Sequence, residues 1–274
     1  MARETAKAGE FQRFNIHHRI QHIMMFSSFI LCTITGLPIK YNGSFWAPAV
    51  TSFFGGFDTM FAIHLVGAVV MLACSAYHLV YLVIYPLVVR KPATTRKYPP
   101  AEAYRKISRG LASYPGLAML PTPKDVLDLL QNMRYFLGLS PEKAKFGRYS
   151  YKEKFDYWAV FWGMAIMGGS GLMMWFPHLA AEYFPRWIID AARYAHSDEA
   201  MLAILAIFVW HFFNVHFNPT FFPMNFVWFH GKMNRELMEE EHPDELRELE
   251  ERMPVATGRG KSQVRPVGVK NYGR

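Results

Sequence analysis

The chain alternates between long apolar blocks and polar connections, and four of the blocks have the length of a membrane-spanning helix. They cover approximately residues 21–38, 61–89, 155–176 and 199–217. An α-helix needs about 20 mostly apolar residues to cross the hydrocarbon core of a bilayer. The pattern therefore predicts an all-α fold, an integral membrane four-helix bundle.

The basic residues between the blocks predict how the bundle is oriented. The chain has a formal charge of +8, and the connection 90–154 holds fourteen lysines and arginines, whereas the connections 39–60 and 177–198 hold one and two. Lys and Arg concentrate on the cytoplasmic side of membrane proteins. We therefore expect both termini and the long loop between the second and third helices to be cytoplasmic. The positive charge then serves orientation and contact with membrane lipid, and nucleic acid is not expected as a partner.

This pattern divides the chain into three parts. Residues 1–19 form a cytoplasmic segment, residues 20–231 the transmembrane domain with its loop, and residues 232–274 a charged cytoplasmic tail with a helical stretch near 238–252. Within the loop, the apolar periodicity of residues 123–138 predicts an amphipathic helix that lies along the membrane surface or against a partner. No cleavable signal is expected, because the first block lacks a cleavage pattern.

Two cysteines, Cys32 and Cys74, lie inside apolar blocks and are expected to be small buried hydrophobic residues. The sequence contains no C-x-x-C-H, so covalent attachment of a c-type haem is excluded, and no cysteine spacing typical of zinc sites occurs.

Six of the eleven histidines lie in or at the ends of the apolar blocks: His22, His64, His78, His196, His211 and His216. The predicted orientation places His64 and His196 in a periplasmic layer. The other four fall in a cytoplasmic layer, with His216 closest to the cytoplasm. Ionisable residues inside membrane segments mark functional sites.

The spacing of the histidines on the fourth block points to haem. His196 and His211 are fifteen residues apart, which on a helix is a rise of about 22 Å and a return to within about 60° of the same face. Two layers of imidazoles are typical of two stacked haems, each iron bound by two neutral imidazoles. Any single histidine could instead be a hydrogen-bonded core residue, but that interpretation gives no reason for two layers. The histidines at positions 178, 230 and 242 are expected at the surface or in solvent.

Four sequence elements, in order, resemble a known family. They are R-I-Q-H (Arg19–His22), I-H-L-V-G (Ile63–Gly67), F-G-R-Y-S-Y-K-E-K (Phe146–Lys154) before a third helix that ends in W-F-P, and the fourth block with its two histidines. The chain resembles the four-helix di-haem cytochrome b subunits of membrane formate dehydrogenases, nickel–iron hydrogenases and related respiratory complexes, from about residue 13 to residue 231.

The resemblance implies two b haems in a multi-pass protein of a bacterial or archaeal cytoplasmic (inner) membrane. It implies that His64 and His196 bind the iron of the periplasmic haem, and that His22 and His211 bind that of the cytoplasmic haem.

Two features depart from the family pattern. The fourth block spaces its histidines by fifteen residues where fourteen are expected, which predicts an extra residue in the helix as a π-bulge. His78 has no counterpart, which leaves the partner of His211 open. With His216, it could bind a third haem, donate to a quinone carbonyl, or replace His22 or His211 as a ligand.

We therefore expect a b-type cytochrome subunit that carries electrons between a quinone pool, menaquinone or ubiquinone, and a redox partner subunit. That partner is an iron–sulphur protein or a multihaem cytochrome c. Bis-histidine ligation leaves no open position on iron, and the blocks contain no nucleophile–base set, so a stand-alone catalyst is not expected. One alternative is a proton- or ion-translocating protein that uses the same histidines, although such proteins carry more charged residues inside their helices. The other is a membrane anchor without redox function.

Overall fold

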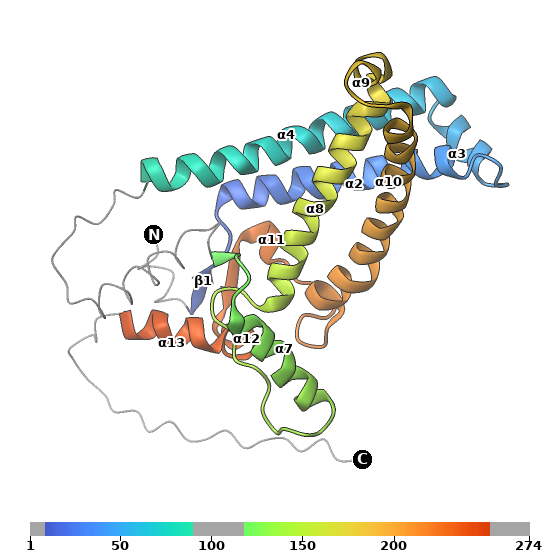
Figure 1. Cartoon of the computed structure of the whole chain (residues 1–274). Helices are drawn as coiled ribbons and strands as arrows, with labels where there is room; N and C mark the ends of the chain where they lie inside the picture. The colour runs from blue at the N-terminus through green and yellow to red at the C-terminus, as the bar shows by residue number, and fades with distance from the viewer. Residues whose placement is uncertain (1–8, 90–117, 253–274) are drawn as a thin grey trace, which may run out of the picture.

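Four long helices dominate the structure, a computed structural model that describes residues 9–89 and 118–252 (Figure 1). They are α2 (Ile16–Lys40), α4 (Phe57–Val89), α8 (Tyr151–Trp175) and α10 (Arg186–Leu205), the last of which continues through two π-helical segments, η2 (Ala206–His211) and η3 (Phe213–Phe217). The prediction of a helical membrane protein is confirmed. The described residues also contain one two-stranded β-ribbon, which the sequence did not predict.

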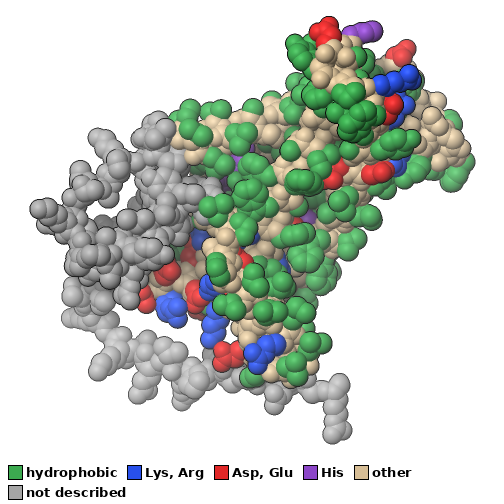
Figure 2. Space-filling model, in the orientation of Figure 1, with side chains coloured by type: hydrophobic (Ala, Val, Ile, Leu, Met, Phe, Trp, Pro, Cys, Tyr) green, Lys and Arg blue, Asp and Glu red, His purple; other side chains and the backbone are tan. Residues whose placement is uncertain are grey.

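Three of these helices are long and apolar enough to cross a membrane: α2, α4 as far as Ile84, and the continuous helix from Arg186 to Phe217. The fourth predicted span, α8, passes the same test only together with α9 (Pro177–Tyr183), after a bend of 105°. Large apolar side chains cover the outside of the helices (Figure 2). Such a surface is stable in lipid and would be a liability in water.

The four helices form two close pairs. α2 packs along α4, and α8 packs along α10, whereas direct contact between the two pairs is sparse. Small residues allow the close approach within the first pair, since a Cβ atom at Gly67 would lie 2.8 Å from Cys32 Sγ. In Figure 1 the α8–α10 pair crosses the α2–α4 pair steeply. His64 of the first pair and His196 of the second approach each other across this crossing.

Two connections that were predicted as loops are partly helical. The connection after the first block contains α3 (Ala47–Phe53). α10 begins at Arg186, well before the predicted start of the fourth block, so His196 lies inside a helix and not at its beginning. The alanines and arginines of this extension are good helix formers. The helix therefore begins before the apolar residues that hydropathy detects.

The predicted tail is folded as far as the structure describes it. β1 (Glu10–Gln12) pairs antiparallel with β2 (Lys232–Asn234), and the chain continues from α11 (Val227–His230) through β2 into α12 (Arg235–Glu241) and α13 (Pro243–Arg252). Apolar side chains from both ends of the chain form a small core: Phe11, Val227, Met233, Met238 and Leu246. The helical stretch is confirmed. The expectation that His242 is solvated is wrong, because only 5% of it is exposed.

A buried ionic cluster holds this region to the start of α8. The guanidinium of Arg13, which is 4% exposed, donates to the Glu245 carboxylate and, at 2.7 Å, to the backbone carbonyl of Arg148. Arg148 donates in return to Glu245 at 2.7 Å and to the carbonyl of Arg13 at 2.6 Å. His242 Nδ1 donates to the carbonyl of Gly147 at 2.8 Å, so its Nε2 accepts from Arg13 at 3.1 Å. The cluster joins segments more than 200 residues apart.

Replacing Glu245 with Ala is expected to release the C-terminal helices. The change removes the nearer of the two carboxylates of the buried Arg13 guanidinium and leaves Glu153 at 3.6 Å, and breaking a buried ion pair costs up to about 3–5 kcal/mol. Limited proteolysis of the membrane-bound protein should then cleave within residues 232–252 earlier than in the wild type. Glu251→Gln, at an exposed position of α13, is the matched control. Equal cleavage in the two variants would contradict the structural role of the cluster.

The stability of the same region is expected to fall in mild acid. Burial lowers the pKa of His242 below its usual 6.5. The nearby Arg13 lowers this pKa further, whereas the Glu153 carboxylate raises it. A group whose folded pKa is depressed takes up its proton first in the unfolded state, so stability is lost as the pH falls through about 6.5. Thermal unfolding followed from pH 8 to pH 5 should show this decline. The decline should be shallower in His242→Gln, and an unchanged slope would exclude His242 as its source.

Candidate functional site

Two histidines from different helix pairs face each other at the end of the molecule where α2 terminates. The ring centres of His64 on α4 and His196 on α10 are 6.5 Å apart, with an angle of 66° between the ring planes. Lys40 at the end of α2 pairs with Asp198 on α10 at 3.0 Å close by. The structure therefore brings together the two histidines that were predicted to share a layer.

A hydroxyl group orients each of these imidazoles. Thr35 Oγ1 donates to the Leu31 carbonyl of its own helix at 2.7 Å, and it lies 3.0 Å from His64 Nδ1. With its proton committed, the hydroxyl can only accept from His64. His64 Nδ1 therefore carries the ring proton, and Nε2 keeps its lone pair.

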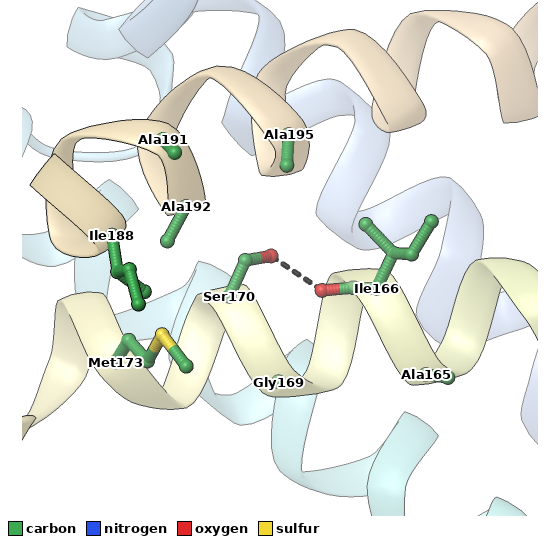
Figure 3. A pocket seen from close by; sticks show the side chains of 9 residues that line it. All are labelled: Ala165, Ile166, Gly169, Ser170, Met173, Ile188, Ala191, Ala192 and Ala195. Carbon is green, nitrogen blue, oxygen red and sulfur yellow. Dashed lines mark hydrogen bonds between the residues drawn. The ribbon is translucent and has the colours of Figure 1, made fainter. Parts of the chain in front are cut away.

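His196 is held in the same way by α8. Ser170 Oγ donates to the Ile166 carbonyl at 2.5 Å (Figure 3) and lies 3.1 Å from His196 Nδ1, which is also 3.2 Å from the carbonyl of Met167. His196 Nε2 is again the unprotonated nitrogen. Histidine ligands of metals almost always donate their other N–H to such a partner, which fixes the tautomer and the ring orientation.

Each imidazole also lies against a glycine that follows the orienting hydroxyl residue. A Cβ atom at Gly36 would be 3.2 Å from His64 Cε1, and one at Gly171 would be 3.2 Å from His196 Cε1. Thr35–Gly36 on α2 and Ser170–Gly171 on α8 thus form two equivalent cradles, one in each helix pair.

The geometry of this pair fits a haem iron. A metal–imidazole bond of about 2 Å places two rings on opposite sides of one metal ion with their centres roughly 6 Å apart. In the described residues, no three or more His, Cys, Asp or Glu side chains gather so as to hold a metal ion by themselves. A haem suits two imidazoles because its macrocycle supplies the remaining four nitrogen ligands.

A second group of histidines lies at the opposite end of the helices. His211 and His216 have ring centres 6.2 Å apart, and His22 at the start of α2 is within electrostatic range of both. His211 Nδ1 lies 3.1 Å from the Asp156 carboxylate on α8. His211 therefore has a carboxylate as its orienting partner, whereas His64 and His196 have neutral hydroxyls.

Unpartnered polar atoms concentrate at this second end. Among the described residues, the buried side-chain nitrogens without a hydrogen-bond partner are Arg19 Nε, Gln21 Nε2, His22 Nδ1, Trp210 Nε1 and His216 Nδ1. All of them lie near the start of α2 or the end of the fourth helix. A buried polar group without a partner costs on the order of 1–3 kcal/mol, so this end is suited to a ligand with polar groups.

The predicted π-bulge in the fourth helix is confirmed. The backbone changes from α-helix to π-helix at Ala206 and remains so to His211, with a second π segment at Phe213–Phe217. A π turn takes up one more residue than an α turn, and such bulges are frequent at functional sites. The bulge lies between His196 and His211, where it absorbs the additional residue of their spacing.

His78 is engaged with the protein at both ring nitrogens. Its Nδ1 donates to Gln21 Oε1 at 2.8 Å, and its Nε2 accepts from the Tyr157 hydroxyl at 3.1 Å. The chain Gln21–His78–Tyr157 links α2, α4 and α8 next to the second histidine group. His216, only 8% exposed, lies among the unpartnered groups instead.

A shallow groove of about 320 Å³ lies between α8 and α10 (Figure 3). Its lining includes small residues on both helices, among them Ala165 and Gly169 on α8 and Ala191 and Ala195 on α10. None of the predicted site histidines lines this groove. Its small side chains allow α8 and α10 to approach closely, which places Ser170 against His196.

Sequence reasoning missed the groups that orient the imidazoles. Thr35 and Ser170 each precede a glycine inside an apolar block, and this pattern could have indicated their role. The glycine has no side chain, so an imidazole can approach the neighbouring hydroxyl. Asp156 lies at the start of the third block. A carboxylate at that position is easily interpreted as a residue that faces the lipid headgroups and has no partner in the protein.

Comparison with known proteins gives one group of relatives. The chain is 24% identical over 133 residues to the cytochrome b556(Fdn) subunit of the nitrate-inducible formate dehydrogenase from Escherichia coli K12, and equally to those from Escherichia coli O157:H7 and Shigella flexneri. The match covers 48% of this chain and 58% of each relative. No protein-family model matches the chain. The predicted resemblance is confirmed as a weak homology, over about half of the chain, to a cytochrome b subunit of a formate dehydrogenase.

Proposed function

We propose that this chain is a b-type cytochrome that carries electrons across a membrane between a quinone and a redox partner subunit. The observation that carries the proposal is the pair of His64 and His196, whose ring centres are 6.5 Å apart and whose Nδ1 protons are each committed to a hydroxyl, so that each Nε2 lone pair is free to bind a metal. The weak homology to cytochrome b556 subunits supports the same conclusion.

We assign a second haem to the other end, between His22 and His211. The contact with Asp156 supports His211 as a ligand, since a carboxylate fixes the tautomer that leaves Nε2 free. His216, 6.2 Å from His211, is the alternative ligand at this end. The unpartnered nitrogens of Arg19 and Trp210 are available to polar groups of the bound molecule.

When bound, the haems supply reversible one-electron chemistry. The protein positions them and excludes water. Thr35, Ser170 and Asp156 hold the Nδ1 protons of the ligand imidazoles, and Gly36 and Gly171 leave room for the rings. Two such sites at opposite ends of the helices divide the width of the membrane into shorter electron-transfer steps.

We place the quinone, menaquinone or ubiquinone, at the end that contains His22 and His78. Quinone chemistry takes up or releases protons, and the Gln21–His78–Tyr157 chain is a set of hydrogen-bonded groups that can pass them. His78 acts here as a hydrogen-bonding residue, since ligation of iron would require its Nε2 to leave Tyr157. The fourteen basic residues of the 90–154 connection support a cytoplasmic position for this end. The redox partner is an iron–sulphur protein or a multihaem cytochrome c.

Haem content tests the proposal directly. The purified wild type is expected to carry about two equivalents of non-covalent haem per chain, because each iron takes two imidazoles. His64→Ala and His196→Ala should each lose about one equivalent, while His178→Ala, at an exposed position of α9, should lose none. Haem extraction and quantitation provide the measurement. A colourless wild type would refute the cytochrome, and full haem content in both variants would refute this ligand pair.

The role of His78 can be separated from that of a ligand. His78→Ala is expected to retain both haems and to slow their reduction by a quinol, because the hydrogen-bonded chain is broken while the iron ligands stay. Stopped-flow reduction by a quinol, compared with reduction by dithionite, gives the measurement. His17→Ala, which removes an exposed histidine bonded to Tyr77, is the control. Loss of a haem would instead make His78 a ligand, and unchanged kinetics would make it a packing residue.

A further inference from the structure

The amphipathic helix α7 (Pro123–Phe136) has its polar side against the protein. Asp125 pairs with Lys154 of α8 at 2.8 Å. Asn132, which is 7% exposed, accepts from the backbone N–H of Ala144 at 2.9 Å and donates to the Tyr151 hydroxyl at 3.3 Å. This is the reverse of a helix on a water-soluble protein, which buries its apolar side.

The apolar side of α7 is open. Its side chains recur at the helical spacing that defines one face, and each is at least half exposed: Val126 58%, Leu127 64%, Leu130 50%, Met133 50%, Phe136 76% and Leu137 69%. In Figure 2 the hydrophobic side chains that cover α8 and α10 continue onto this part of the surface. Exposed apolar patches of this kind mark interaction surfaces.

The position of α7 indicates what covers this face. Its first turn is tied to α8 by Lys154, and the indole N–H of Trp158 on α8 donates to the carbonyl of Met119, just before α7, at 2.8 Å. Lys154 and Trp158 lie in the first two turns of α8. Nearby on the same helix, Phe155 and Trp162 are 57% and 66% exposed. α7 lies across the line of α8 and does not continue it (Figure 1). Its apolar face is therefore level with the point where the lipid-facing surface of α8 begins.

We propose that α7 is an interfacial helix that inserts its apolar face into the phospholipid surface of the membrane. The patch is continuous with the surface that α8 presents to lipid, and cations accompany it. Arg134 is exposed on the last turn of α7, and Lys145, which follows the helix and is 62% exposed at its side chain, pairs with the similarly exposed Glu142 at 3.4 Å. Long basic side chains at such a position extend toward phosphate groups while their stems stay in the apolar layer. The exposed charge of Arg134 favours a lipid surface over an apolar protein partner.

Photo-crosslinking in native membranes tests the proposal with the full-length protein in its own complex. A benzophenone side chain is introduced in place of Leu130 or Met133 on the open face, and in place of Glu142, whose side chain is 70% exposed beyond the helix, as the control. After irradiation, intact-mass analysis separates phospholipid adducts from protein adducts. We expect several-fold more phospholipid adduct at Leu130 and Met133 than at Glu142. All of these positions are exposed, so the substitutions leave the packed side of α7 intact.

The other outcomes overturn the proposal. Adducts to another subunit, or to a second copy of this chain, would make α7 a protein-docking helix. Phospholipid adducts no more abundant than at Glu142 would place the face in water. If one variant does not accumulate, Leu127 and Phe136 lie on the same face and substitute for it.

Discussion

A buried guanidinium group at one end of the helices determines how the separate parts of the chain are joined. Arg13 stands just before α2 and Arg148 just before α8, and both donate to Glu245 of α13. A buried charge that lacks its partner costs several kcal/mol, so the cluster is stable only when the N-terminal segment, the connection before α8 and the C-terminal helices are all in place. The first helix of each pair therefore starts from the same fixed point.

This anchoring explains why the two helix pairs need little direct contact. α2–α4 and α8–α10 each pack closely through small residues, and between the pairs lie imidazoles held by hydroxyls of the neighbouring helix. Thr35 and Ser170 satisfy the Nδ1 protons from within their own pair, so neither pair depends on the other for these contacts. His64 and His196, one from each pair, approach each other with their Nε2 atoms unprotonated, as the proposed shared metal would require.

The amino-acid pattern predicts the parts of this structure that depend on local chemistry. Hydropathy located the long helices, and the fifteen-residue spacing, set against the family pattern, indicated the π segment at Ala206–His211. The start of α10 was missed because Ala and Arg, which are good helix formers, extend the helix beyond its apolar length. The burial of His242 was missed because its partner Arg13 is 229 residues away, and a pairing of that separation leaves no local pattern. The periodicity of α7 showed that it has an apolar face, but not that this face points away from the protein.

The two histidine groups differ in whether the protein itself provides hydrogen-bond partners for their buried ring nitrogens. This difference supports the different roles proposed for them. At the His64 end the protein itself provides a partner for each ring Nδ1, so the geometry is fixed before anything binds. At the other end His22, Trp210 and His216 keep buried nitrogens without partners. Unpaired buried groups raise the free energy of the protein alone, and a molecule that pairs them is bound more tightly by that amount. In the proposed function, the first end holds one haem rigidly. The second end gains stability from what it binds, which in the same proposal is the second haem and the quinone beside it.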